Sequence, residues 1–369
     1  MEYVSTCKTA LNSAGRCLLY GAGNIGQEAV EVFQKTTIKP VAFIDSRKTG
    51  FWAGLPVFHP ESTPDELKKL PVVITIFSYP SDCSLLKIIP VLKSAGFHSI
   101  ISFESFYLHF HNFFEKKHFW LSHPDAFEKH TEELDTVCNF LADDISKNVL
   151  QKQIAFRLTG EIEDMSAASP SDQQYFDSTV PCGKEFREFW DLGAFTGDTL
   201  KNAAGHAVHF RKVVAFEPDM ANFTCCCKYL EEHRKDYESA IALPLAAGEF
   251  NEILKFTDTA SSDAAISDTG NTLVPSVSLD SAFIGATPDF IKMDIEGSEL
   301  AALKGMRNIL IRNRPLLAVC IYHRPEDIYV IPLYLKNLPG LENYSFYIRC
   351  YGEHLFDTVL YAVPSKMRV

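Results

Sequence analysis

One arrangement occurs twice in this chain, and it constrains the fold more than any other feature of the sequence. A short apolar run leads into a glycine-containing turn and a helical segment, and a second apolar run then ends in an acid. The first copy runs from Cys17–Tyr20 to Asp45, and the second from Phe189–Leu192 to Glu217. Such a unit begins a parallel sheet that binds nucleosides beyond the carboxyl ends of its strands. We therefore expect two α/β domains.

The bulk composition is that of an ordinary soluble globular protein. The 369 residues are 46% hydrophobic and 22% charged, which leaves room for two or three domains. The net charge of -12 argues against a nucleic-acid partner, because affinity for phosphate backbones comes mainly from Lys and Arg. No apolar run is long enough to span a bilayer, and the ten cysteines form neither a disulfide framework nor a zinc pattern. We expect a cytoplasmic protein without a membrane partner.

The first copy carries the dinucleotide-binding spacing G-x-G-x-x-G. Gly21, Gly23 and Gly26 occupy it, and Asp45 follows at nearly the spacing at which an acid holds a ribose hydroxyl. Residues 1–106 are therefore expected to form a smaller Rossmann-like domain that binds a nucleotide or nucleotide sugar. The alternative is a vestigial unit that only packs. Its other expected elements are strands at Val41–Ile44, Val72–Phe77 and His98–Ser102, an edge strand at Gly54–Val57, and helices at Gln27–Gln34 and Ser81–Ala95.

Residues 107–185 are predicted to be a helical linker or cap between the two domains. Ala126–Leu158 is predicted to form one or two helices. Tyr175 and Phe176 lie just before the second domain, where they could cover a ligand or simply be core. The apolar stripe of the helices is expected to consist of Leu134, Val137, Leu141, Ile145 and Leu150.

The second copy has a different glycine spacing, in the turn D-L-G-A-F-T-G-D-T. Gly193 and Gly197 are four apart, which suits a looser loop that passes under a nucleoside rather than round a pyrophosphate. Glu217, at the end of the second strand, can accept hydrogen bonds from both ribose hydroxyls. A third strand at Ile241–Ala247 ends in small residues where an adenine plane could lie. Further expected elements are a hairpin of Ile253–Phe256 and Ser276–Leu279, a strand at Leu316–Ile321, a helix at Ile328–Leu338 and a hairpin of Ser345–Cys350 and Thr358–Val363.

A strand, an acidic turn and a helix follow one another later in this domain. Phe290–Met293 is expected to be a buried strand, and Asp294 and Glu296 come directly after it. A helix is predicted at Ser298–Leu310. We expect the two carboxylates to point to opposite sides of the turn, so that only one of them faces a reacting atom. The alternative is a solvated acidic loop in which Ser298 or Glu296 caps the helix.

Residues 186–369 resemble the FkbM family of methyltransferases. The matching motifs keep their order over about 180 residues of the chain. The motifs are D-L-G-A-F-T-G-D-T (Asp191–Thr199), F-E-P-D with Asn222, F-I-K-M-D-I-E-G-S-E (Phe290–Glu299), and I-Y-H-R-P-E-D (Ile321–Asp327) with Ile331 and Pro332. More loosely, Leu19–Val57 resembles the N-terminal domains of sugar O-acyltransferases, which bind nucleotide sugars.

The FkbM resemblance implies a class I methyltransferase fold with a seven-stranded Rossmann-like sheet and S-adenosylmethionine as methyl donor. It also implies O-methylation, usually of a hydroxyl on a sugar or another small polar molecule. The residues predicted to bind the donor are Asp191, Gly193, Ala194, Gly197, Asp198, Glu217, Asn222 and Ala247.

A hydroxyl is a poor nucleophile that needs a base as the bond forms. We expect His323 to act as this base, and Asp294 to orient either His323 or the substrate, with Glu296 beside them. The alternative for His323 is a helix-cap histidine before Arg324–Pro325. Asp294 and Glu296 could also hold Mg²⁺ together with a substrate diol.

A rival function uses the first domain instead. A nicotinamide-dependent oxidoreductase, or a nucleotide-sugar-binding module, could work through Gly21–Asp45 and leave the second domain as scaffold. Against the oxidoreductase, the first domain has no Tyr-x-x-x-Lys or comparable hydride-transfer arrangement.

Overall fold

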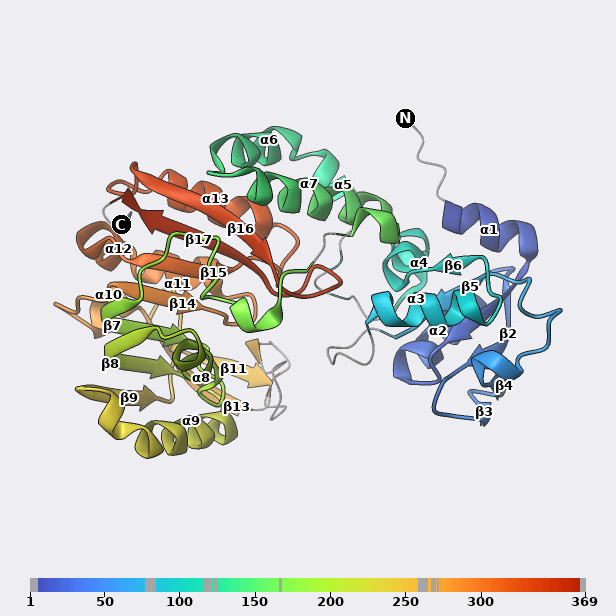
Figure 1. Ribbon diagram of the computed structural model, residues 1–369, viewed down its shortest axis with the longest axis horizontal. Coiled ribbons are helices and arrows are strands. Elements are labelled where there is room, and N and C mark those ends of the chain that lie inside the picture. The colour runs from blue at the N-terminus through green and yellow to red at the C-terminus, as the bar shows by residue number, and fades with distance from the viewer. Residues whose placement is uncertain are drawn as a thin grey trace. The chain divides into compact units, whose positions relative to one another are not determined.

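The computed structural model describes residues 6–76, 84–115, 118, 121, 125–165, 168–257, 265–266, 270 and 272–365. The chain divides into two compact units (Figure 1). Unit 1 comprises Met1–His130 and Gln151–Ser166, and unit 2 comprises Thr131–Leu150 and Ala167–Val369. The chain thus passes between the units three times, and helix α7 (Asp144–Thr159) belongs to both. The domain limits at residues 106 and 186 stay a prediction.

Unit 1 is built around a sheet with the strand order β3-β4-β2-β1-β5-β6. Its described strand pairs are parallel except for β3 with β4. The segment expected at the sheet edge, Gly54–Val57, lies one position further in as β4, because β3 pairs with its outer side. Phe77 and Ser81 lie outside the described residues. The elements are α1 (Thr6–Ala14), β1 (Arg16–Tyr20), α2 (Asn24–Gln34), β2 (Lys39–Ile44), β3 (Gly50–Trp52), β4 (Leu55–Phe58), β5 (Val72–Ile74), α3 (Leu85–Ser94), β6 (Ile100–Ile101), α4 (Phe103–Phe110) and α5 (Asp125–Glu128).

Unit 2 has the predicted seven-stranded sheet, in the order β16-β17-β15-β14-β7-β8-β9 over its described residues. Five strands of this sheet run parallel, namely β9, β8, β7, β14 and β15. Strands β16 and β17 close the sheet as an antiparallel hairpin. Every residue of β14 and β15 is buried, as expected for central strands covered on both faces. The sheet strands are β7 (Glu185–Leu192), β8 (His209–Phe216), β9 (Ser239–Leu243), β14 (Phe290–Met293), β15 (Leu316–Cys320), β16 (Tyr344–Cys350) and β17 (Thr358–Pro364).

The third strand of this sheet is shorter than predicted. Strand β9 ends at Leu243, and Ala246–Ala247 forms β10 in a separate four-stranded sheet of order β10-β13-β11-β12. The ladder stops there because the N–H of Leu245 donates to the carbonyl of Leu243 instead of to β8. The predicted antiparallel pairing is confirmed for β11 with β13, within this smaller sheet, but β13 begins at Thr272 and Leu279 already belongs to a helix. The smaller sheet consists of β10 (Ala246–Ala247), β11 (Glu252–Thr257), β12 (Ala265–Ile266) and β13 (Thr272–Val277).

The helix predicted at Ser298–Leu310 is two helices. Asp280 accepts hydrogen bonds from the main-chain N–H groups of Asn308 and Ile309, each at 2.8 Å, and so caps a new helix after Met306. The other helices of unit 2 are α6 (Thr131–Phe140), α8 (Asp198–Gly205), α9 (Met220–Glu232), α10 (Leu279–Ala282), α11 (Glu299–Gly305), α12 (Arg307–Asn313) and α13 (Asp327–Lys336).

Part of the predicted linker packs on the large sheet of unit 2. Helix α6 contacts α13, and Leu141 forms an isolated bridge with Phe346 of β16. Of the predicted apolar stripe, Ile145 is exposed while the other four side chains are buried. No helix in the described part of the chain combines the length and apolar character needed to cross a membrane.

Candidate functional site

The turn after β7 is held in a conformation that favours glycine at two positions. Gly193 has φ 80° and Gly197 has φ 86°. A Cβ at Gly193 would lie 1.8 Å from the main-chain oxygen of Asp294, so the turn packs directly against the end of β14. The N–H groups of Gly193 and Ala194 both donate to the carbonyl of Phe216. The ends of β8 and β14 therefore fix this turn between them.

Glu217, at the end of β8, faces the same turn. Its Oε2 accepts a hydrogen bond from the N–H of Phe195 at 2.8 Å, and its Oε1 accepts one from the N–H of Asp219 at 2.9 Å. The side chain is 6% exposed, and burial raises its pKa to about 7 although both N–H groups act to lower it. Each carboxylate oxygen keeps a further lone pair, which suits the two hydroxyls of a ribose.

The other residues predicted for the donor lie in varied surroundings. Asp191 is fully buried and pairs with Lys292, its register partner on β14, at 3.0 Å. Asp198 is exposed at the start of α8. Asn222 is buried in the first turn of α9, and Ala247 is buried in β10. The structure thus brings the loop glycines and Glu217 together, and places Asp191 behind them as the partner of a buried lysine.

Lys292 is not among the residues predicted for the site, yet it connects the two halves of it. Its Nζ lies 2.5 Å from the carbonyl of Gly193. Burial alone would lower the pKa of Lys292, but Asp191 and Asp294 raise it overall. Burial raises the pKa of Asp191 to about 6 despite the lysine, so the pair is charged at neutral pH. The sequence signal that could have identified this pair is a Lys in the apolar run Phe290–Met293 and an Asp in the apolar run Phe189–Leu192.

One buried imidazole gathers the carboxylates that follow β14. His323 Nε2 lies 3.3 Å from Asp294 Oδ1 and 3.4 Å from Glu296 Oε2, while its Nδ1 lies 2.8 Å from Glu299 Oε1. The side chains of His323 and Glu299 are 1% and 0% exposed, whereas those of Asp294 and Glu296 are 24% and 23% exposed. From this cluster, a ligand meets Asp294 and Glu296 first.

Two of the predictions made for the acidic turn are wrong. Asp294 and Glu296 do not point to opposite sides, because their carboxylates lie 3.3 and 3.4 Å from the same atom, His323 Nε2. Residues two positions apart share a side even on an extended chain, so alternation could not have separated them. The turn also does not cap α11 with Ser298 or Glu296. Ser298, at the cap position, makes no side-chain capping bond, and Glu299 accepts the N–H of Ile295 instead.

The helix-cap alternative for His323 is wrong too, since its side chain turns to the carboxylates and α13 begins only at Asp327. Burial alone would lower the pKa of His323, but Glu299 and Glu296 raise it well above 6.5, which favours the imidazolium form. Burial would raise the pKa of Asp294, but Lys292 and then His323 hold it below its usual value. The pKa of Glu296 is raised, chiefly by burial.

Tyr175 and Phe176 are core residues. Both side chains are buried in the cluster that contains Phe290 of β14 and Phe189 of β7. Tyr175 still reaches the site, because its hydroxyl donates to Asp294 Oδ2 at 2.8 Å.

Three groups of the cluster are close enough to surround a metal ion. Asp294, Glu299 and His323 each offer one ligand atom, and these atoms lie within 4.8 Å of one another. Glu299 Oε1 is already bonded to the N–H of Ile295 and to His323 Nδ1. Mg²⁺ prefers oxygen ligands, and an imidazolium cannot be a ligand. The donor set therefore fits Mg²⁺ poorly in this arrangement.

The glycine fingerprint of unit 1 forms a tight turn. A Cβ at Gly26 would lie 2.3 Å from the carbonyl of Gly21, which itself has φ 114°. Gly23 precedes α2 and has open space around its Cα. This geometry is that of a turn between a strand and a helix in a Rossmann-like sheet.

The acid of the fingerprint folds back onto the turn. Asp45 Oδ2 accepts the N–H of Ala22 at 2.9 Å, and Oδ1 accepts the N–H groups of Arg47 and Lys48 at 2.8 and 2.9 Å. Lys48 Nζ also donates to the carbonyl of Ala22. Asp45 thus braces the turn in this structure, and nucleotide binding through it stays a prediction.

Comparison with known proteins agrees with this geometry. Residues 191–342 match the family described as the methyltransferase FkbM domain. The crystal structure of methyltransferase FkbM from Methylobacillus flagellatus KT is similar with a TM-score of 0.77 and 23% identity, over 96% of this chain and 92% of that one. This likeness shows a shared fold. No curated protein sequence matches the chain.

More distant structures cover about half of this chain. A putative rRNA methylase from Clostridium thermocellum has 11% identity and a TM-score of 0.35, over 54% of this chain and 98% of that one. A methyltransferase from Geobacter sulfurreducens has 15% identity and a TM-score of 0.30, over 52% and 84%. Because both scores are below 0.5, no conclusion is drawn from these two.

Proposed function

We propose that this chain, whose residues 191–342 form an S-adenosylmethionine-dependent methyltransferase domain of the FkbM family, methylates a hydroxyl of a sugar or another small polar molecule. The observation that carries the proposal is the pair Asp294 and Glu296. Both carboxylates are partly exposed, both lie against His323, and Asp294 adjoins the glycine turn at Gly193. A hydroxyl bound there would meet hydrogen-bond acceptors directly beside the donor turn.

The methyl donor is proposed to bind at the turn Gly193–Gly197 with its ribose on Glu217. When bound, the donor would supply a sulfonium methyl group: the acceptor oxygen would bond to the methyl carbon while the carbon–sulfur bond breaks, so that S-adenosylhomocysteine is the leaving group. The chain's own contribution to such a displacement is mainly to bring the two reactants together in the right orientation. Asp191 and Lys292 contribute by fixing the carbonyl of Gly193, and thereby the turn.

The charges around the site favour an uncharged acceptor. Three carboxylates, Asp294, Glu296 and Glu299, surround one imidazolium, His323, and the pair of Lys292 with Asp191 adds no net charge. A phosphorylated or carboxylated group would meet repulsion beside this excess of negative charge. Vicinal hydroxyls, in contrast, can donate to both exposed carboxylates, and this supports a polyhydroxy acceptor such as a sugar.

The proton of the acceptor is the point where we revise the role expected of His323. An imidazole that is already protonated and almost inaccessible is a poor base. We propose that Glu296, whose burial makes it a stronger base than an ordinary carboxylate, takes the proton, and that Asp294 orients the hydroxyl. His323 holds the two carboxylates together and balances their charge.

A methyl-transfer assay tests the proposed function. Tritiated S-adenosylmethionine would be incubated with monosaccharides, methyl glycosides, sugar phosphates and amino acids, with and without EDTA. We expect label on unphosphorylated sugars or glycosides, with no loss in EDTA. Transfer only to amines or carboxylates would contradict hydroxyl methylation, and loss of activity in EDTA would restore the magnesium alternative.

A further inference from the structure

We propose that Tyr175 is a positioning residue for methyl transfer, because its hydroxyl fixes the carboxylate of Asp294 and a buried polar network around Arg349 holds Tyr175 in place. The inference rests on the proposed role of Asp294 at the acceptor. The other proposed site residues follow strands of the sheet, whereas Tyr175 lies in the segment that precedes β7.

Besides Asp294, the hydroxyl of Tyr175 has two neighbours, the side-chain amide of Gln174 and the thiol of Cys320 at 3.5 Å. The side-chain amide of Gln174 donates to the Tyr175 oxygen at 3.0 Å, so the hydroxyl proton is free to go to Asp294 Oδ2 at 2.8 Å. The other oxygen of Asp294 lies 3.3 Å from His323 Nε2. Tyr175 thus holds one carboxylate oxygen of Asp294 by a hydrogen bond, while His323 lies within ion-pair distance of the other.

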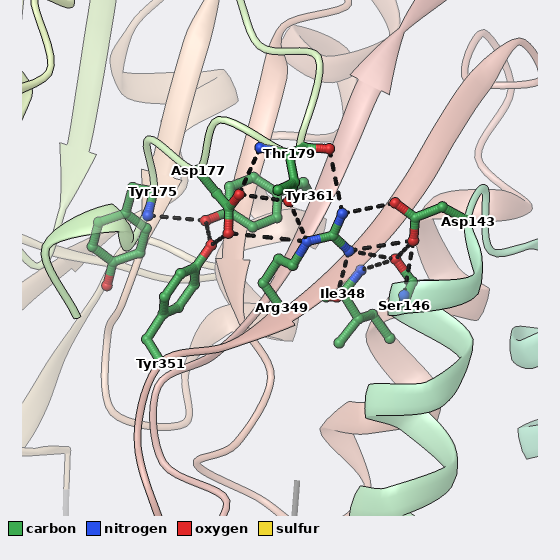
Figure 2. A network of polar contacts seen from close by, with 9 residues as sticks. All are labelled: Asp143, Ser146, Tyr175, Asp177, Thr179, Ile348, Arg349, Tyr351 and Tyr361. Atoms are coloured by element: carbon green, nitrogen blue, oxygen red, sulfur yellow. Dashed lines mark hydrogen bonds and ion pairs between the residues drawn. The ribbon is translucent and has the colours of Figure 1, made fainter. Parts of the chain in front are cut away.

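The backbone of Tyr175 is strained. Its φ of 70° lies in the left-handed region, which a bulky residue adopts only where the surrounding structure requires it. The N–H of Tyr175 donates to the hydroxyl of Tyr361 at 2.9 Å (Figure 2). Tyr361 lies on β17 and is fully buried. This bond ties the strained residue to the large sheet.

A chain of buried hydroxyls continues from there, as Figure 2 shows. The Tyr361 oxygen lies 2.7 Å from that of Tyr351, and the Tyr351 hydroxyl donates to Asp177 Oδ2 at 2.9 Å. Asp177 Oδ1 in turn accepts the N–H and the hydroxyl of Thr179 at 2.7 and 2.6 Å. These hydrogen bonds therefore lead back to the segment that carries Tyr175 and fix that segment at a second place, Asp177 and Thr179.

Arg349 anchors this segment at its far end. Its side chain is 1% exposed, and its Nε donates to Thr179 Oγ1 at 2.8 Å. The remaining guanidinium nitrogens donate to Asp143 Oδ2 at 2.7 Å and to Ser146 Oγ at 2.8 Å, both at the start of α7 (Figure 2). A buried guanidinium is weak evidence for stability, but a network with several directional bonds selects one arrangement of its members. We infer that the arrangement selected here is the one that places Tyr175 on Asp294.

Tyr175→Phe tests the proposal, since it removes the hydroxyl and nothing else. Tyr344→Phe is the matched control, because Tyr344 is also buried and donates to a main-chain carbonyl, that of Pro315, at 2.8 Å. Carbon-13 NMR of aspartate carboxyl groups, with Asp294→Asn used for assignment, reports on Asp294 without any acceptor. We expect the Asp294 signal to shift in Tyr175→Phe and to stay in Tyr344→Phe, with the affinity for S-adenosylhomocysteine unchanged in both.

The kinetic arm uses whichever compound of the acceptor panel the wild type methylates. Tyr175→Phe is expected to lower kcat about 10- to 100-fold, the range for a hydrogen bond to a charged group, while KM for the donor stays the same. In an Asp294→Asn background the same change should have no further effect, because Tyr175 acts through Asp294.

Three results would overturn the proposal: an unmoved Asp294 signal in folded Tyr175→Phe, an equal shift in Tyr344→Phe, or additive losses in the double mutant. If the wild type methylates nothing in the panel, the proposed function fails, and the carboxyl signal still decides the role of Tyr175.

Discussion

Glu217 is a buried carboxylate whose pKa of about 7 is far above its ordinary value of 4.5. The unfolded chain ionises this group as pH rises past 4.5, whereas the folded chain resists until about 7, so the group lowers the free energy of unfolding across that interval. We predict that Glu217→Gln raises the melting temperature of the donor-free protein at pH 8 but not at pH 4. The same variant should bind S-adenosylhomocysteine more weakly by about 1.5–3 kcal/mol, the range for charged hydrogen bonds.

Melting curves at both pH values and calorimetry with S-adenosylhomocysteine measure these effects. Glu232→Gln, an exposed change at the end of α9, is the control and should alter neither quantity. Unchanged affinity in folded Glu217→Gln would remove this carboxylate from the donor site.

The pH dependence of the reaction separates the two possible bases. If Glu296 takes the proton, it must be ionised, so the rate falls as pH drops below its raised pKa. Because His323 must keep its second proton, the rate also falls as pH rises past the raised pKa of the imidazole, and kcat/KM is bell-shaped. We predict that Glu296→Gln lowers kcat by roughly 10²–10⁴-fold. A rate that climbs through the pKa of His323 and stays high would instead identify His323 as the base.

At the scale of single residues, the sequence predicts which residues form the acidic turn after β14 better than it predicts which side chains are buried around it. Asp294 and His323 follow adjacent strands, so their convergence is predictable. Glu299 reads as an ordinary acid in the first turn of a helix, and only tertiary packing shows that it is fully buried against the imidazole. The contact of Tyr175 with Asp294 spans 119 positions and depends on a left-handed backbone that no local pattern indicates.

At the scale of elements, the turn after β7 has no space for a side chain at the position of Gly193. We predict that Gly193→Ala displaces this turn or the end of β14, because its Cβ would meet the Asp294 carbonyl at 1.8 Å and its φ of 80° is unfavourable for Ala. Binding of S-adenosylhomocysteine should be lost or strongly weakened, and the melting temperature should fall, as measured by thermal shift and calorimetry.

The control for this variant is Gly205→Ala. Gly205 ends helix α8, has open space where a Cβ would stand, and has no positive φ. There the greater helix propensity of Ala should leave stability equal or slightly higher, by up to ~1 kcal/mol. Equal donor affinity in the two variants would mean that the turn is not part of the donor site.

Elements that follow from a local run of residues are predictable from the sequence, whereas boundaries set by contacts between distant residues are not. The buried strands β14 and β15 stand out as apolar runs, and the sequence predicts them well. The end of β9 at Leu243 and the helix start set by Asp280 are less predictable. Asp280 caps a segment 28 positions away, and periodicity within a single helix does not indicate such a partner.

At the scale of the whole molecule, two units each carry a turn and an acid of the kind that binds a nucleoside. We predict that the methyl donor uses the second pattern alone. Asp45→Asn in the full chain should leave the affinity for S-adenosylhomocysteine unchanged, while Glu217→Gln weakens it, as titration calorimetry can measure. The reverse result would place the donor in unit 1 and overturn the proposed donor site.

The sequence predicts two α/β units and the class of each, because strand, turn and helix follow one another locally. It does not predict that the helical segment between them is divided, with Thr131–Leu150 in unit 2 and Gln151–Ser166 in unit 1. Asp143 and Ser146, which belong to unit 2, bond to Arg349, more than 200 positions later.

This division limits how the gene can be cut or recombined. A coding segment that begins at residue 186 starts inside β7 and lacks Asp143, Ser146 and Thr179, the acidic and hydroxyl partners that hydrogen-bond to Arg349. The guanidinium would then lose these hydrogen bonds, each worth about 1.5–3 kcal/mol for a charged group, a large part of what keeps a typical domain folded. A shuffled or transplanted catalytic module must therefore bring the stretch from residue 131 with it, so the unit of inheritance is longer than the recognisable family domain.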